Sequence, residues 1–193
     1  MPHTKTTIVT APTVEPVSLE EMRLWLRIDG NDQDTMLSEL IRAARTHLEQ
    51  VTWRAFCTQT WDVYWDSFDS ELILPKPPIQ SVTITYYDTG GTLRTLADTV
   101  YELGSRNEIG LVREKYQQTW PAVRGHRDQV IVRMICGYGV ASDVPYPLRT
   151  AIKFLAAHWY VNPEPVNVGN ITTNLPFTID ALISSYRLLD FAA

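Results

Sequence analysis

The spacing of apolar residues changes at Thr60, and this change most constrains what the chain can fold into. Over residues 33–53 apolar side chains recur every three or four positions, which predicts one long amphipathic helix. Over residues 61–66 they alternate with polar ones, which predicts a half-buried strand. A helical pattern returns after residue 146. Helices, then several strands, then a helix, without alternation, predict an α+β fold.

The first helix has a clear start signal. Ser18 is in the position of an N-cap, and Glu21 three residues later completes a capping box. We therefore predict a short helix from Leu19 to about Arg27. The polar stretch 29–34 then ends it and begins the long second helix, so that the two form a helical hairpin or corner.

The central region predicts an antiparallel sheet. Strands are expected at 61–66, 72–74 and 81–87, a hairpin turn at DTGG, and up to three more short strands before Gly137. Lys76-Pro77-Pro78 lacks two backbone donors, so it marks an edge or a crossing between strands.

A third helix is expected from Pro147 to about Val161, where Pro163 and Pro165 end it. The following stretch is polar and irregular, and a last short helix over 179–187 is capped by Thr178. The predicted organisation is therefore an N-terminal helical part, an inserted β-rich region, a helix that completes the helical body, and an extended C-terminal tail: residues 1–59, 60–140, 141–162 and 163–193.

Composition excludes several classes of protein. The chain of 193 residues has 45% hydrophobic residues, enough for a real core, but it has no run of 18 apolar residues and no signal-peptide core. A cytoplasmic site of synthesis, without a membrane, is expected. Cys57 and Cys136 are not in a CxxC motif, so buried thiols are favoured over a disulfide or a nucleophile.

Charge argues against a dedicated nucleic-acid binder. There are 22 acidic and 17 basic residues, for a net charge of −5, and the acidity is spread evenly. One local group is basic, and we interpret it first as a solvated loop face and second as a binding patch: Arg113, Lys115, Arg124, Arg127 and Arg133.

Catalytic and metal motifs are not found. The loop starting at Asp29 has neither the glycine nor the glutamate of a calcium loop. Asp62 and Asp66, on one strand face, would lie roughly 13 Å apart, beyond the ~5–9.5 Å of glycosidase carboxylates, so solvent-facing carboxylates are expected. The four histidines are far apart in sequence, and no nucleophile-elbow, phosphate-loop or dinucleotide motif occurs. No cofactor, metal or catalytic residue is predicted.

Taken in order, the motifs resemble those of one family. VSLEEMRLWLRID, DTMLSELIRAARTHLEQVTWRAFCTQTWDVYWDSF, LPKPPIQSVTITYYDTGGT, VIVRMICGYG and VPYPLRTAIKFLAAHWYVNPEPVNVG resemble the head-tail connector (adaptor) proteins of tailed phages, prophages and gene transfer agents. The resemblance runs from about Val17 to Tyr186.

The resemblance implies a structural protein and not an enzyme. Its subunits form a ring, with twelve as the expected number, below the portal protein at the head-tail junction of the virion, and they assemble in the host cytoplasm. The ring extends the channel, and DNA passes through without specific binding. A neck or tail-terminator or stopper protein attaches below.

The contact residues are predicted from the spacing and chemistry of the sequence and not from the family. In the tail, apolar side chains in a polar segment are expected to contact the portal: Ile171, Leu175, Phe177, Leu182 and Tyr186. In the β-rich region, a stiff hairpin is expected to contact a neighbour or the next component: Pro75, Pro77, Pro78, Tyr86 and Tyr87. The alternative is that this sheet only completes the chain's own core.

Two other functions stay open from the sequence. A nucleic-acid-binding module would use the basic group and nearby aromatic residues, and would bind DNA in a salt-dependent way. A small hydrolase would need acids and a histidine that converge from distant positions.

Overall fold

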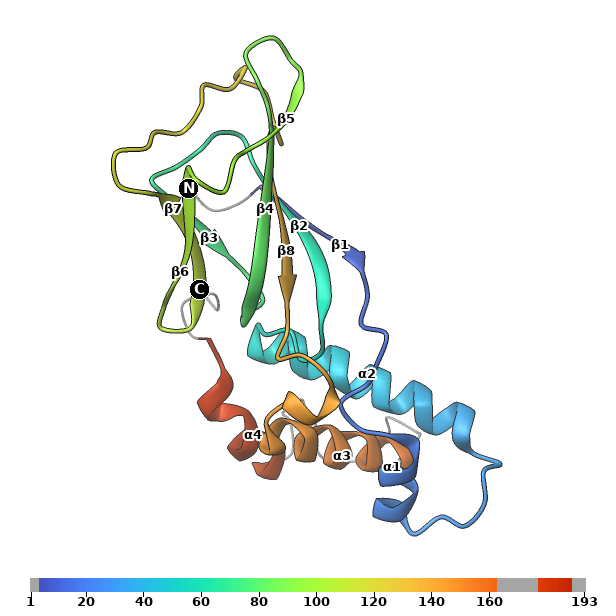
Figure 1. The fold of residues 1–193 in the computed structure, drawn as a ribbon. Helices are drawn as coiled ribbons and strands as arrows, with labels where there is room; N and C mark the ends of the chain where they lie inside the picture. The colour runs from blue at the N-terminus through green and yellow to red at the C-terminus, as the bar shows by residue number, and fades with distance from the viewer. Residues whose placement is uncertain (1–3, 163–176, 189–193) are drawn as a thin grey trace, which may run out of the picture. The chain divides into compact units, whose positions relative to one another are not determined.

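A computed structural model describes residues 4–162 and 177–188 of the chain. The chain divides into two compact units (Figure 1). The strand unit consists of residues 1–13 and 58–138, and the helical unit consists of residues 14–57 and 139–193. All described strands lie in the first unit and all described helices lie in the second. The predicted α+β fold is confirmed.

The larger sheet of the strand unit has five antiparallel strands in the order β1-β2-β8-β4-β5. Their bounds are β1 Lys5–Thr10, β2 Gln59–Trp65, β8 Val130–Cys136, β4 Ile79–Tyr87 and β5 Leu93–Thr95. Val63, Val132 and Ile84 are cross-strand partners on one face, and all three are fully buried. The alternation expected for residues 61–66 therefore places the core of this unit on one side of the sheet.

The smaller sheet has three antiparallel strands in the order β3-β7-β6, which are Glu71–Leu74, Ile109–Glu114 and Tyr101–Arg106. It packs on the larger sheet. The Tyr101 hydroxyl donates a hydrogen bond of 3.2 Å to the Val82 carbonyl of β4. Gly110 of β7 lies so close to Ile79 of β4 that an added Cβ would be 2.5 Å from the Ile79 Cγ1 atom.

Residues 75–78 connect β3 in the smaller sheet to β4 in the larger one. The proline-rich segment is therefore a crossing between strands, as predicted, and it lies outside the hydrogen-bonded ladders, where the missing donors cost nothing.

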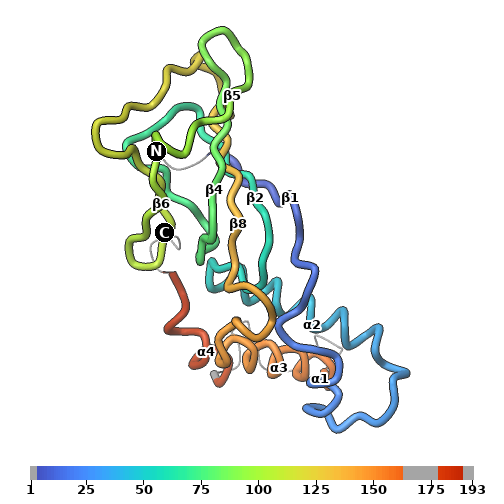
Figure 2. The backbone as a smooth tube through the Cα atoms, in the orientation of Figure 1, coloured from blue at the N-terminus to red at the C-terminus, as the bar shows by residue number. Residues whose placement is uncertain are grey.

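The first strand was not predicted. β1 pairs with β2 through Thr6↔Val63 and neighbouring residues, and the two backbones run side by side (Figure 2). The predicted N-terminal helical part therefore differs from the structure, because residues 4–13 belong to the strand unit.

The helical unit is built from α1 Leu19–Leu26, α2 Asp34–Thr52, α3 Tyr146–Val161 and α4 Phe177–Ile183, with short 3-10 helices at Ala141–Asp143 and Ser184–Tyr186. The predicted capping box is present: the Ser18 Oγ atom accepts from the Glu21 amide, and the Glu21 carboxylate accepts from the Ser18 amide. The long helices pack through fully buried residues, of which Leu37, Leu48 and Ile152 are examples.

Candidate interaction surfaces

The predicted contact residues of the β-rich region do not form one exposed surface. Pro75 and Pro77 are buried, while Pro78, Tyr86 and Tyr87 are half-buried. Two of the five residues therefore stabilise the strand unit itself, and the sheet does complete a core of its own. The half-buried members are the ones that a partner could still reach.

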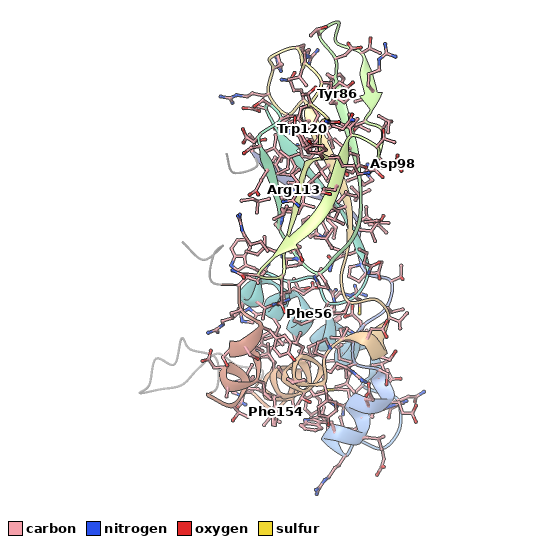
Figure 3. The ribbon with its side chains drawn as sticks, turned by 60° about the vertical axis from the view of Figure 1, so that its left-hand side comes forward. Phe56, Tyr86, Asp98, Arg113, Trp120 and Phe154 are labelled. Carbon is pink, nitrogen blue, oxygen red and sulfur yellow. The ribbon has the colours of Figure 1, made fainter. Side chains whose placement is uncertain are left out.

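Both tyrosines already contact side chains of the strand unit. The ring centroids of Tyr86 and Phe68 are 5.8 Å apart, and Phe68 stacks on Trp120 at 4.7 Å. Figure 3 shows Tyr86 and Trp120 close together. The Arg124 guanidinium lies 5.0 Å from the centroid of the Tyr87 ring. These rings cover the core and leave part of their surface accessible.

In the predicted tail surface, Ile171 and Leu175 lie outside the described residues, and Phe177 is described only as the first residue of α4. Leu182 and Tyr186 are half-buried. The Tyr186 carbonyl accepts a hydrogen bond of 2.6 Å from the Arg54 Nε atom.

The helix α4 is more firmly attached than a segment that orders only on a partner. Ile179 and Ile183 are buried in the helical unit, where α4 packs on α3. The contact of this helix with the portal stays a prediction, and the structure adds that the helix contributes to the core of its own unit.

Two members of the basic group form ion pairs with carboxylates. Arg113 pairs with Glu102 at 2.6 Å, Arg133 pairs with Asp62 at 2.8 Å, and the Lys115 Nζ atom donates to the carbonyl of Asp98. Figure 3 labels Arg113 and Asp98 in the strand unit. Pairing of Arg113 and Arg133 reduces the charge that the group offers to a phosphate backbone.

Asp62 was expected to face solvent, and this is wrong. Only 9% of its side chain is exposed, and it pairs with Arg133 of the neighbouring strand. The carboxylate accepts two hydrogen bonds of 2.8 Å from this guanidinium. These hydrogen bonds, and then the negative charge of Asp62, raise the pKa of Arg133. Directly opposed residues on adjacent strands are close enough for such a pair. Asp62 and Arg133 therefore form an ion pair between adjacent strands.

Both cysteines, Cys57 and Cys136, are buried, as predicted, and burial raises the pKa of the Cys57 thiol to about 11. No group of three or more His, Cys, Asp or Glu side chains in residues 4–162 and 177–188 is placed to hold a metal ion. Within the same residues, none of the helices has the length and apolar character needed to cross a bilayer.

The helical unit has an exposed aromatic surface that the sequence analysis did not single out. Trp25 of α1 is 40% exposed, and its ring meets Phe154 of α3 edge-on at 5.2 Å. Lys153 places its Nζ atom 5.2 Å from the Trp25 ring centroid and 5.6 Å from that of Tyr146. The residues of this surface come from two helices far apart in the sequence, so no local pattern indicates it.

Part of the chain matches the model of a known protein family. Residues 16–94 match the model of the phage gp6-like head-tail connector protein family, which confirms the resemblance over that segment. No curated protein gave a match.

Solved structures share the fold along nearly the whole chain. A chain in the neck of an empty GTA particle computed with C6 symmetry is 22% identical, with a TM-score of 0.81, and the match covers 96% of each chain. A chain in the virion of a native gene transfer agent particle is 23% identical, with a TM-score of 0.78 and 95% coverage of each. A chain in the neck of a native GTA particle computed with C12 symmetry is 22% identical, with a TM-score of 0.74 and 96% coverage of each.

Proposed function

We propose, from the match of residues 16–94 to the phage gp6-like head-tail connector family, that this chain is a structural connector subunit in the neck of a phage or gene transfer agent particle. The shared fold with neck chains over 96% of the sequence supports this proposal most strongly, because it includes both the helical and the strand unit. The protein then acts as a structural component of the virion and not as an enzyme.

The finer proposal concerns assembly. Related folds occur in necks computed with C6 and C12 symmetry, which supports a ring, and twelve subunits is the number we propose. The ring sits below the portal protein, extends the DNA channel, and carries a neck, tail-terminator or stopper protein below. Even, slightly negative charge suits a channel in which DNA slides without specific binding.

The mass of the assembly tests this function. Native mass spectrometry is run on the purified chain alone and after mixing with the portal ring of the same particle. We expect a complex with one connector subunit per portal subunit. Failure to bind the portal, together with salt-dependent DNA binding by the free chain, would refute the connector and favour the nucleic-acid-binding alternative.

The tail is proposed to bind the portal. Truncation after Pro165 is a poor test, because it would also remove the buried Ile179 and Ile183 from the helical unit. Replacing Ile171 and Leu175 by serine avoids that loss. We expect weaker portal binding with an unchanged thermal unfolding midpoint, and we expect Leu103→Ser, in the strand unit, to bind the portal normally.

The strand unit is proposed to contact the tail-side partner through Pro78, Tyr86 and Tyr87. Deleting residues 71–136 would remove β8 from the middle of the larger sheet, so point substitution is preferable. Tyr87→Ala is expected to leave rings on the portal intact and to reduce the fraction of particles with tails in electron micrographs. Normal tail attachment would contradict this contact.

A further inference from the structure

The outer face of α3 is apolar and exposed. Tyr146, Phe154 and Val161 are 69%, 36% and 68% exposed, and their spacing of eight and seven residues places them along one side of the helix. Trp25 extends this surface from α1 by its edge-on contact with Phe154. Figure 3 shows Phe154 on the outside of the helical unit. An exposed group of large apolar side chains of this kind marks an interaction site.

The ammonium group of Lys153 lies within this aromatic surface. Lys153 is only 8% exposed, and its Nζ atom lies near the Trp25 and Tyr146 rings. Among the described residues it forms no ion pair with a carboxylate. Aromatic faces compensate in part for the water that such an ammonium group loses. A carboxylate supplied from outside the subunit would complete its environment.

The outer face of α2 has complementary properties. Met36 is 44% exposed, and the exposed Ala43 lies about two turns further along the same side. Trp53, which is 40% exposed, is the left-handed C-cap residue that follows the helix. Glu39 is exposed on the same face and forms no ion pair within residues 4–162 and 177–188. This face therefore presents Met36, Ala43 and the Glu39 carboxylate, with the exposed polar Thr46 and Gln50 further along the helix.

These two outer faces point away from each other. α2 and α3 pack together through their inner sides, which carry buried residues such as Leu37, Leu48 and Leu155. The exposed side chains of each helix are on the side opposite to that contact. Two different surfaces on opposite sides of a subunit are what a head-to-tail interface requires, and such an interface closes into a ring when the rotation permits.

We propose that the outer face of α3, with Trp25, binds the outer face of α2 in a second copy of this chain, with Lys153 facing Glu39 of the neighbour. The inference rests on the proposed connector function, because it describes the subunit contact of that ring. A second copy is the occupant because this chain itself carries the Glu39 carboxylate, with the exposed Met36 beside it, that complements Lys153 and its aromatic surroundings.

Photo-cross-linking on the assembled portal-connector complex tests the contact. A benzophenone amino acid replaces Phe154, and the control replaces Leu103, which is similarly exposed but lies in the strand unit. Mixing isotope-labelled and unlabelled chains distinguishes a link between copies from one within a chain. We expect the Phe154 variant to capture a peptide of residues 33–54 from another copy, and the control to capture none of these residues.

A charge substitution gives a second readout. Glu39→Lys on the exposed face of α2 is expected to weaken ring formation tenfold or more, while Asp98→Lys, with the same charge change in the strand unit, has little effect. Three outcomes would contradict this contact without contradicting the connector function. The Phe154 variant could capture the portal, it could capture α3 of another copy, or the ring could form without any capture of α2. If the unmodified chain forms no ring on the portal, both proposals fail.

Discussion

Glu21 and Arg149 join the start of α1 to α3 through a hydrogen bond of 2.6 Å between a carboxylate oxygen and the guanidinium. The other Glu21 oxygen accepts from the Ser18 amide at 3.0 Å and so closes the capping box. Arg149 also donates to the Pro16 carbonyl. One carboxylate therefore fixes both the beginning of a helix and its position on the rest of the helical unit.

Substitutions at this site should separate the two roles of Glu21. Ser18→Ala removes only the cap and is expected to lower the free energy of unfolding by about 1 kcal/mol. Glu21→Ala keeps the bond from the amide of residue 21 to the Ser18 Oγ atom, but it removes the carboxylate bond to the Ser18 amide and the contact with Arg149, so we expect a larger loss of about 2 kcal/mol. Urea denaturation measures both. Equal losses in the two variants would mean that Arg149 contributes nothing through Glu21.

Gly110 should not tolerate a side chain. An added Cβ would lie 2.5 Å from the Ile79 Cγ1 atom, so Gly110→Ala must push the two sheets apart and is expected to cost about 1 to 3 kcal/mol of unfolding free energy. The matched control is Gly104→Ala in β6, where the nearest atom, on Leu111, would be at an ordinary 3.5 Å. Thermal unfolding of both variants checks this, and similar midpoints would contradict the close packing.

The Asp62–Arg133 pair should contribute more to the free energy of unfolding than an exposed ion pair does, because Asp62 is buried. Arg133→Met leaves a carboxylate that is only 9% exposed without its two hydrogen bonds, and we expect a loss of about 1 to 2 kcal/mol. In the control pair both partners are exposed, so Arg113→Met should cost less than about 1 kcal/mol. Chemical denaturation compares them, and an equal effect would show that burial of Asp62 does not matter.

Stability should fall at alkaline pH because of Cys57. Burial raises the pKa of its thiol in the folded protein from 9.0 to about 11, with the charge of Glu15 as a second cause. The folded state therefore holds this proton more tightly than the unfolded state. The resulting contribution, roughly 2 to 3 kcal/mol, is complete below the unfolded pKa and is lost as pH rises through the folded pKa.

Cys57→Ala tests this linkage. We expect the variant to lose less stability than the unmodified protein between about pH 8 and about pH 11 in urea denaturation. Tyr101 also has a raised pKa because of burial, so some alkaline loss is expected in both proteins. Parallel pH profiles for the two would show that the Cys57 thiol does not titrate as described.

Local sequence patterns predicted most of the helices and strands, but not the contacts between side chains of different elements. The capping box at Ser18 and the alternation after Thr60 are encoded within a few residues, so both could be recognised from the sequence. β1 was not predicted, although residues 6–10 are all β-branched, because a short polar N-terminal segment without alternation does not by itself indicate a strand. The burial of Asp62 depends on the register with β8, which no local pattern specifies.

The same reason limits the prediction of interaction surfaces. Pro75 and Pro77 were selected for their stiffness, but whether they are exposed depends on the packing of two sheets. The surface around Lys153 was missed because Trp25 and Phe154 come from helices far apart in the chain. Side-chain neighbours across such distances require the tertiary structure.

The order in which the chain builds its two units limits which gene segments can be exchanged between related proteins. The chain passes from one unit to the other after residues 13, 57 and 138, so neither unit corresponds to one uninterrupted stretch of gene. A recombination event that transferred only the codons for residues 58–138 would import four of the five strands of the larger sheet and leave β1 to be supplied by the recipient. Successful hybrids would thus require recipients whose first ten residues can still pair with a foreign β2.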